Sequence, residues 1–167
     1  MPAAHVRAPL VFAGHGLQVP EMDYDDLRGL DLKGKIAVVI AGAPKGWPGP
    51  ISAHVQNAEV RWDGLRRAGA IGIIQLPKVQ TLPWARASRI QTLMSARTPG
   101  AEEFRGQQIQ VAFNPAHANL LFEGTGHTFA ELLKLSDGQS PLPHFPLNKE
   151  LIAETAVTQG SLESQNI

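Results

Sequence analysis

The chain has 167 residues, of which 43% are hydrophobic and 18% charged, the size and composition of a single globular domain. Fifteen basic and fifteen acidic side chains cancel, so we expect neither nucleic-acid binding nor attraction to an anionic membrane. The absence of cysteine excludes disulfides, thiolate metal sites and cysteine nucleophiles. No apolar run approaches the ~20 residues that a transmembrane helix requires.

The first predicted strand is Pro9–Ala13, which follows a lead-in of residues 1–8. It ends at Gly14-His15-Gly16, a glycine pair without the third glycine and the immediate helix of a dinucleotide-binding loop. We therefore predict a turn at this point. His15 is expected to be an exposed turn residue rather than a ligand.

A second strand is predicted at Ile36–Ile40, because this short, unbroken, β-branched run is typical of a strand buried on both faces. The preceding loop carries Asp25 and Asp26, which can cap backbone amides, and Gly34, which can adopt a positive φ. Asp23, Asp25 and Asp26 lack the alternating ligand register and closing glutamate of an EF-hand. We predict that they cap turns and do not bind calcium.

Residues 41–52 hold three prolines and three glycines, so we expect a loop. Trp47 in this loop is either a contact residue or a side chain folded back on the core, and the sequence leaves both open. A helix is predicted over residues 53–68, with Ser52 as N-cap and Gly69 as C-terminal cap. A strand over residues 70–76 follows at once, which predicts a crossover that places it parallel to Ile36–Ile40.

Residues 77–107 form a variable excursion with a local basic excess. Trp84, Arg86 and Arg89 lie in it, and two interpretations remain open. The segment is either a solvated excursion anchored by Trp84, or a lip that contacts a partner domain or a peptide carboxylate through arginine.

The second half of the chain alternates strand and helix signals. Residues 108–113 predict a half-buried strand, and Asn114-Pro115 predicts the start of a helix. Thr125 or Thr128 is expected to cap a further helix over residues 129–135. Residues 147–157 alternate loosely and predict a long strand or hairpin that ends the domain.

Several of these motifs, in this order, resemble the protease-associated domain inserted in secreted zinc aminopeptidases and glutamate-carboxypeptidase-like peptidases. The resemblance extends over residues 9–167, with a poorly matching middle at 77–107. The matching features are Asp25-Asp26, Gly29, Asp31 and Lys33-Gly34-Lys35 before the buried strand, the Ala68-Gly69-Ala70-Ile71-Gly72 join, and Asn114-Pro115 with the helices after it.

The resemblance implies a mixed α/β (α+β) fold of the swivelling β/β/α type, an open, partly barrelled mixed sheet with a few flanking helices. Residues 1–167 would be one domain whose two ends lie close together, with residues 147–167 returning towards the catalytic domain of a longer peptidase. That peptidase would be periplasmic or secreted, with a signal sequence outside these residues and zinc in its catalytic domain. The domain would roof the active-site cleft and meet the catalytic domain or peptide through Trp47, Trp84, Arg86 and Arg89.

We expect no catalytic, cofactor-binding or metal-binding residue in this chain. None of the six histidines lies two residues before an aspartate, as the first zinc ligands of the resembled peptidases do, and no Gly-x-Ser-x-Gly elbow is present. Two alternatives remain. One is a self-standing protein- or peptide-binding module of the same fold; the other is a small α/β enzyme that uses the aspartate cluster and His15.

Overall fold

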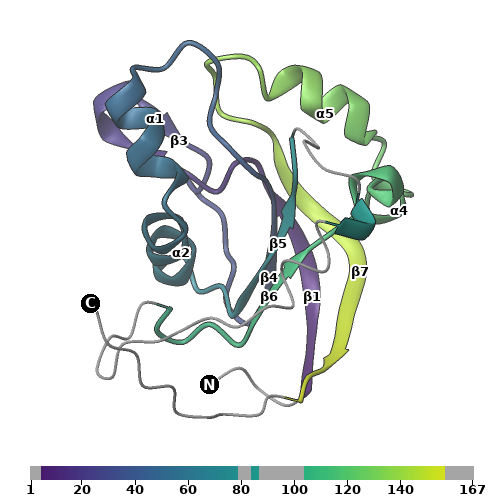
Figure 1. The fold of residues 1–167 in the computed structure, drawn as a ribbon. Coiled ribbons are helices and arrows are strands. Elements are labelled where there is room, and N and C mark those ends of the chain that lie inside the picture. Colours follow the sequence, from purple (N-terminus) through teal and green to yellow (C-terminus); the bar gives the residue numbers. More distant parts are fainter. Residues whose placement is uncertain (1–4, 79–83, 87–103, 157–167) are drawn as a thin grey trace, which may run out of the picture.

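The computed structural model describes residues 5–78, 84–86 and 104–156. Its centre is a five-stranded mixed sheet in the order β6-β5-β4-β1-β7, and a two-stranded sheet, β2-β3, lies apart from it. The fold is thus the predicted mixed α/β class with an open sheet and flanking helices (Figure 1). The strands are β1 (His5–Ala13), β2 (Gln18–Val19), β3 (Tyr24–Asp25), β4 (Ile36–Ile40), β5 (Gly72–Leu76), β6 (Ile109–Ala112) and β7 (His144–Glu154).

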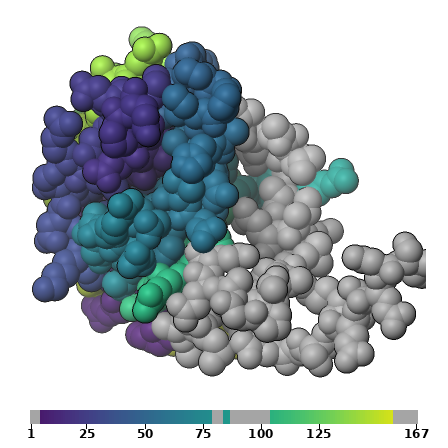
Figure 2. Space-filling view, turned by 90° about the vertical axis from the view of Figure 1, so that its left-hand side faces the viewer, coloured from purple at the N-terminus to yellow at the C-terminus, as the bar shows by residue number. Residues whose placement is uncertain are grey.

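Helices cover both faces of the main sheet. One layer holds α1 (Gly49–Gln56) and α2 (Ala58–Arg67), and the other holds α4 (Asn119–Phe122) and α5 (Phe129–Leu135) (Figure 1). Short 3-10 helices, η1 (Pro20–Met22) and η2 (Pro115–His117), lie in the connections. Figure 2 views the molecule from the α1 and α2 side, where the purple β2-β3 segment packs beside these helices. Within the described part of the chain, none of the helices has the length and apolar character needed to cross a membrane.

Strand β4 is the centre of the core, as its sequence predicts. All five of its residues are fully buried, and it pairs in parallel with both β1 and β5. Ile36, Val38 and Ile40 pack towards α4 and α5, whereas Ala37 and Val39 pack towards α2. This alternation places apolar side chains on both faces, as a strand between two helical layers requires.

The crossover between β4 and β5 contains two helices where the sequence predicted one. α1 ends at Gln56, and the extended Asn57 then caps α2 by accepting a hydrogen bond from the Glu59 amide at 2.8 Å. The predicted helix start was wrong as well: α1 begins at Gly49, so Ser52 lies inside it rather than at its N-cap. The predicted cap at Gly69 is present, with φ +98°, and the crossover is parallel as expected.

Gly72 allows β5 and β6 to pair closely. A Cβ at this position would lie 2.6 Å from Cγ2 and 2.9 Å from the carbonyl oxygen of Ile109, its partner on β6. We expect Gly72→Ala to lower the free energy of unfolding by about 1–3 kcal/mol, the usual cost of overpacking a core.

Urea denaturation measures this effect, and Gly64→Ala is the matched control. A Cβ at Gly64 in α2 would meet only Leu27 Cδ1 at an ordinary 3.5 Å, so that variant should gain up to about 1 kcal/mol from helix propensity. Equal stability of the two variants would contradict the close approach.

The caps predicted in the second half are present. The Asn114 side chain accepts from the Ala116 amide at 3.1 Å, at the start of a 3-10 helix that α4 follows. Of the two threonines, Thr128 caps α5 by accepting from the Glu131 amide at 3.2 Å. Local polar chemistry therefore sets these starts, while burial of Phe122, Phe129 and Leu132 fixes α4 and α5 on the sheet.

Strand β7 closes the edge of the main sheet as an antiparallel partner of β1. The ladder runs from His144, opposite Ala13, to Glu154, opposite His5, with an irregularity between Pro9 and Val11. The lead-in predicted for residues 1–8 therefore contains the first part of β1, because β7 supplies hydrogen-bonding partners from His5 onward. The start of β1 and the end of β7 thus lie side by side (Figure 1).

Candidate functional site

A buried polar cluster lies where the parallel strands β1 and β4 end, the edge of an open α/β sheet at which ligand sites usually form. The chain leaves β1 through a turn in which the Gly16 amide donates to the Ala13 carbonyl at 2.7 Å. Gly14 and Gly16 both have positive φ, and this turn directs His15 inward. His15 is fully buried, so the prediction of an exposed turn residue was wrong.

The His15 ring joins two distant segments. Its Nδ1 lies 3.0 Å from the Ile40 carbonyl oxygen, and its Nε2 lies 3.3 Å from that of Ser136. A neutral imidazole has one N–H. Because the contact to the Ile40 carbonyl is the shorter of the two, we assign the proton to Nδ1, which donates to that carbonyl. Burial, with the positive charges of Lys78 and Arg61, lowers the pKa of His15 to about 4.

Asp26 ties together three parts of the backbone. Its Oδ2 accepts from the amides of His15 at 2.8 Å and Leu17 at 3.4 Å, and its Oδ1 accepts from the Leu142 amide at 3.0 Å. Asp26 is 1% exposed, and a Cβ at Gly14 would lie 2.7 Å from its Oδ1, so only glycine fits beside it. Burial raises the pKa of Asp26 to about 6, although the hydrogen bonds favour the charged form.

Of the three aspartates predicted to cap turns, Asp25 does so, because its Oδ1 accepts from the Leu27 amide at 2.8 Å. Asp26 instead holds the three amides described above, which lie outside its own turn. Asp23 ends η1 through its backbone, whose amide donates to the Pro20 carbonyl, and has φ +48°. Among the residues that the structure describes, no three His, Asp or Glu side chains are placed to hold a metal ion together.

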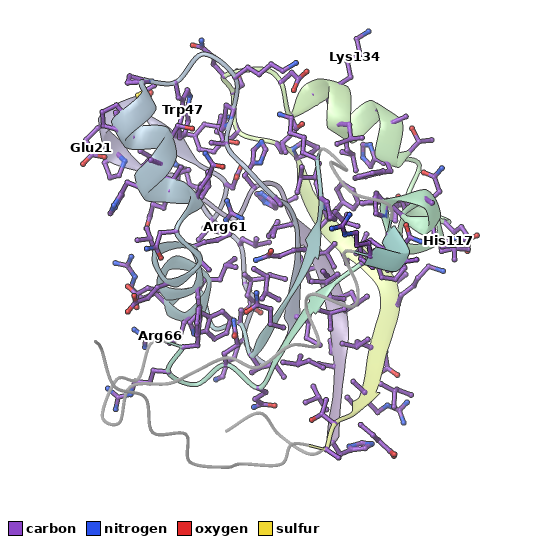
Figure 3. The ribbon with its side chains drawn as sticks, in the orientation of Figure 1. Glu21, Trp47, Arg61, Arg66, His117 and Lys134 are labelled. Carbon is purple, nitrogen blue, oxygen red and sulfur yellow. The ribbon has the colours of Figure 1, made fainter. Side chains whose placement is uncertain are left out.

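Arg61 completes the cluster from α2. Its Nη2 donates to the Gly42 carbonyl at 2.8 Å, just after β4, and lies 3.5 Å from the Val55 carbonyl in the last turn of α1. Burial lowers the pKa of Arg61 to about 10, and the negative charge of Asp26 opposes that shift. Figure 3 shows Arg61 directed into the molecule, whereas Lys134 of α5 is directed outward. Arg61 is 4% exposed, and no local signal in the sequence marks it as a buried arginine.

The cluster is enclosed rather than open to a substrate. His15, Asp26 and Arg61 are at most 4% exposed, and Tyr24 beside them is 1% exposed. Burial raises the pKa of Tyr24, and the nearby charge of Asp26 adds to the shift. In this conformation these groups connect loops, and none presents a reactive atom at the surface.

The predicted partner surface of Trp47, Trp84, Arg86 and Arg89 is only partly described. Trp47 is 8% exposed and packs edge-to-face on Tyr24 with a centroid distance of 5.0 Å, so the interpretation as a core residue is the correct one. Trp84 is half-buried and Arg86 is exposed. Arg89 lies outside the described residues. Trp47 therefore does not contribute to an exposed partner surface.

A groove of about 690 Å³ runs along β1 and β7, and the sequence did not reveal it. Alternation along β7 turns Leu147 and Leu151 towards the core and leaves Ile152 60% exposed. Leu30 and Lys35 contribute the opposite side. One sequence feature could have indicated the exposed apolar surface: Ile152 falls out of the alternation of the apolar residues in the predicted strand. The partner that completes the groove, β1, lies at the other end of the sequence.

Two comparisons with known proteins found no match. No protein-family model matches the chain, and no curated protein matches it in sequence.

Proposed function

We propose that this chain is a non-catalytic protease-associated domain of a zinc-dependent aminopeptidase-like protein. In that role it roofs the active-site cleft of a catalytic domain in the same polypeptide and limits the access of long substrates. The peptidase is periplasmic or secreted, and its zinc is held by the catalytic domain.

The observation that carries the proposal is the pairing of His5 with Glu154. A domain inserted into another must leave and rejoin its host at neighbouring points, and these two residues lie opposite each other in one ladder. The Asp25-Asp26 motif of the resemblance also has a physical role, because Asp26 joins the turn after β1 to the segment before β7. Both features connect the beginning of the domain to its end.

The enclosed polar cluster gives further support. A small enzyme built on the aspartate cluster and His15 would need one of these groups at the surface, yet His15 and Asp26 are 0% and 1% exposed. Placing the chemistry in a separate catalytic domain removes that difficulty.

A self-standing binding module of the same fold is the second candidate, and the groove along β1 and β7 favours it. A volume of about 690 Å³ is within the range of ligand and peptide pockets, so the groove can serve a partner with or without a peptidase. The two candidates differ in whether the partner belongs to the same polypeptide.

The gene downstream of Ile167 separates the two candidates. The proposal expects a His-x-Asp zinc-ligand pair within a few dozen residues, and zinc-dependent hydrolysis of aminoacyl anilides by the longer protein but not by residues 1–167. Because His5 and Glu154 are adjacent, residues 5–154 can be replaced by a short linker in that protein. The deletion should raise hydrolysis of long polypeptides relative to aminoacyl anilides. A stop codon after Ile167, or hydrolysis by residues 1–167 alone, would contradict the proposal.

A further inference from the structure

The first half of β1 and the last part of β7 form a two-stranded ribbon. Strand β1 pairs with β4 only at Leu10–Phe12, whereas its residues from His5 to Pro9 pair with β7 alone. One face of the ribbon is covered, since Val6 and Ala8 are 3% and 2% exposed. The opposite face exposes Arg7, Pro9 and, across the ladder, Ile152. Part of this open face lines the groove.

The groove is mainly apolar, and each charged residue that lines it forms an ion pair. Pro9, Val11, Leu30, Pro146 and Ile152 supply its apolar surface. Its charged lining residues are already used in ion pairs: Asp31 with Lys35 at 3.1 Å, Glu150 with Arg7 at 2.9 Å, and Lys149 with Glu123 at 3.2 Å. A charged peptide would have to displace one of these pairs. The groove therefore fits an uncharged, apolar protein surface.

The position of the groove indicates which surface that is. Ile152 lies two residues before Glu154, a distance of about 7 Å along a strand, and Pro9 lies four residues after His5. A host domain joined through both ends is tethered near this corner of the sheet, and tethering raises its effective concentration there. On the proposed function, that host is the catalytic domain.

We propose that the open face of the β1–β7 ribbon, with Ile152 at its centre, docks on an apolar surface of the catalytic domain in the same polypeptide. The inference rests on the proposed function and adds to it the face by which the lid is held. Pairing of the β7 edge with a second copy is a poorer fit, because Pro146 lacks an amide donor and Asn148 has φ +53°, features that interrupt an edge strand.

Thiol labelling tests the assignment, because the chain has no cysteine. Ile152→Cys and the control Leu120→Cys are each made in residues 1–167 and in the longer protein. Leu120 is 52% exposed on α4, beyond the opposite face of the sheet. Alkylation is followed by peptide-resolved mass spectrometry after thermal melts have shown that each variant folds.

We expect the thiol introduced by Ile152→Cys to react at least about tenfold more slowly in the longer protein than in residues 1–167, the change produced by a docking free energy of about 1.4 kcal/mol. The thiol introduced by Leu120→Cys should react equally in both. Equal labelling rates at position 152 in the two proteins, or slower labelling at both positions in the longer protein, would overturn the inference. Labelling at position 152 that slows as the concentration of residues 1–167 rises would also overturn it, because the occupant would then be a second copy. Zinc peptidase activity with free reaction at position 152 would refute the docking face alone. Protection without such activity would refute the proposed function instead.

Discussion

Replacing Asp26 with alanine will lower the free energy of unfolding by about 3–5 kcal/mol, the effect of leaving buried hydrogen-bonding groups and a buried charge without their partner. The amides of His15, Leu17 and Leu142 lose their acceptor, and Arg61 loses the nearby negative charge that opposes the fall in its pKa. Urea denaturation at neutral pH measures the change.

Asp31→Ala is the matched control for this variant. Asp31 lies in the same loop and also caps a turn, accepting from the Lys33 amide at 2.9 Å, but it is exposed and its ion pair with Lys35 is at the surface. That substitution should lower stability much less than Asp26→Ala, because solvent screens an exposed ion pair. If the two variants were equally stable, Asp26 would not be the tie between the β1 turn and the segment before β7.

Replacing His15 with asparagine will cost more stability at pH 7 than at pH 4, by about 3 kcal/mol. The folded pKa of His15 is lowered from 6.5 to about 4, and each pKa unit corresponds to 1.36 kcal/mol. Between these values the unfolded chain binds a proton that the folded chain does not, so the contribution of His15 is complete above about pH 6.5 and is lost as the pH falls towards 4.

Asp26 acts in the opposite direction over nearly the same range. Its folded pKa is raised from 3.8 to about 6, so the folded chain binds the extra proton and the contribution of Asp26 to stability grows as the pH falls through that range. The two effects largely offset each other in the wild type. In His15→Asn the opposing contribution of His15 is gone, so the pH dependence of stability that Asp26 causes becomes measurable.

Denaturant titrations of wild type and His15→Asn at half-unit steps from pH 4 to pH 7 measure the difference. His117→Asn, at an exposed position in η2, provides the comparison for replacing a surface histidine. A stability difference between wild type and His15→Asn that stays constant with pH would show that His15 is not held neutral in the folded state.

The elements that the sequence predicted well depend on local chemistry. Strand β4 follows from an unbroken β-branched run, and the caps at Asn114 and Thr128 follow from side chains that accept from amides one turn on. The single helix predicted over residues 53–68 was wrong because its apolar spacing continues through Asn57, whose cap interrupts the helix. A pattern of apolar residues cannot show that a polar side chain has ended one helix and begun another.

The site was harder to predict because its partners are distant in sequence. The pairing of Arg7 with Glu150 spans 143 residues, and the hydrogen bond from the Leu142 amide to Asp26 spans 116. Burial of His15 and Arg61 depends on segments packed over them from elsewhere in the chain. The sequence identified Asp25 as a turn cap, but it could not show that Asp26 joins the turn after β1 to the segment before β7.

The joining of the first strand to the last also determines how the chain must fold. Bringing together segments more than a hundred residues apart costs loop-closure entropy before the ladder is formed, which places this topology among the slower folders. During synthesis, the outer edge of β1 stays without its partner until β7 has left the ribosome. Strand β4 can shelter the other edge of β1 much earlier, so premature release of a chain shorter than about residue 154 would leave an open strand prone to aggregation.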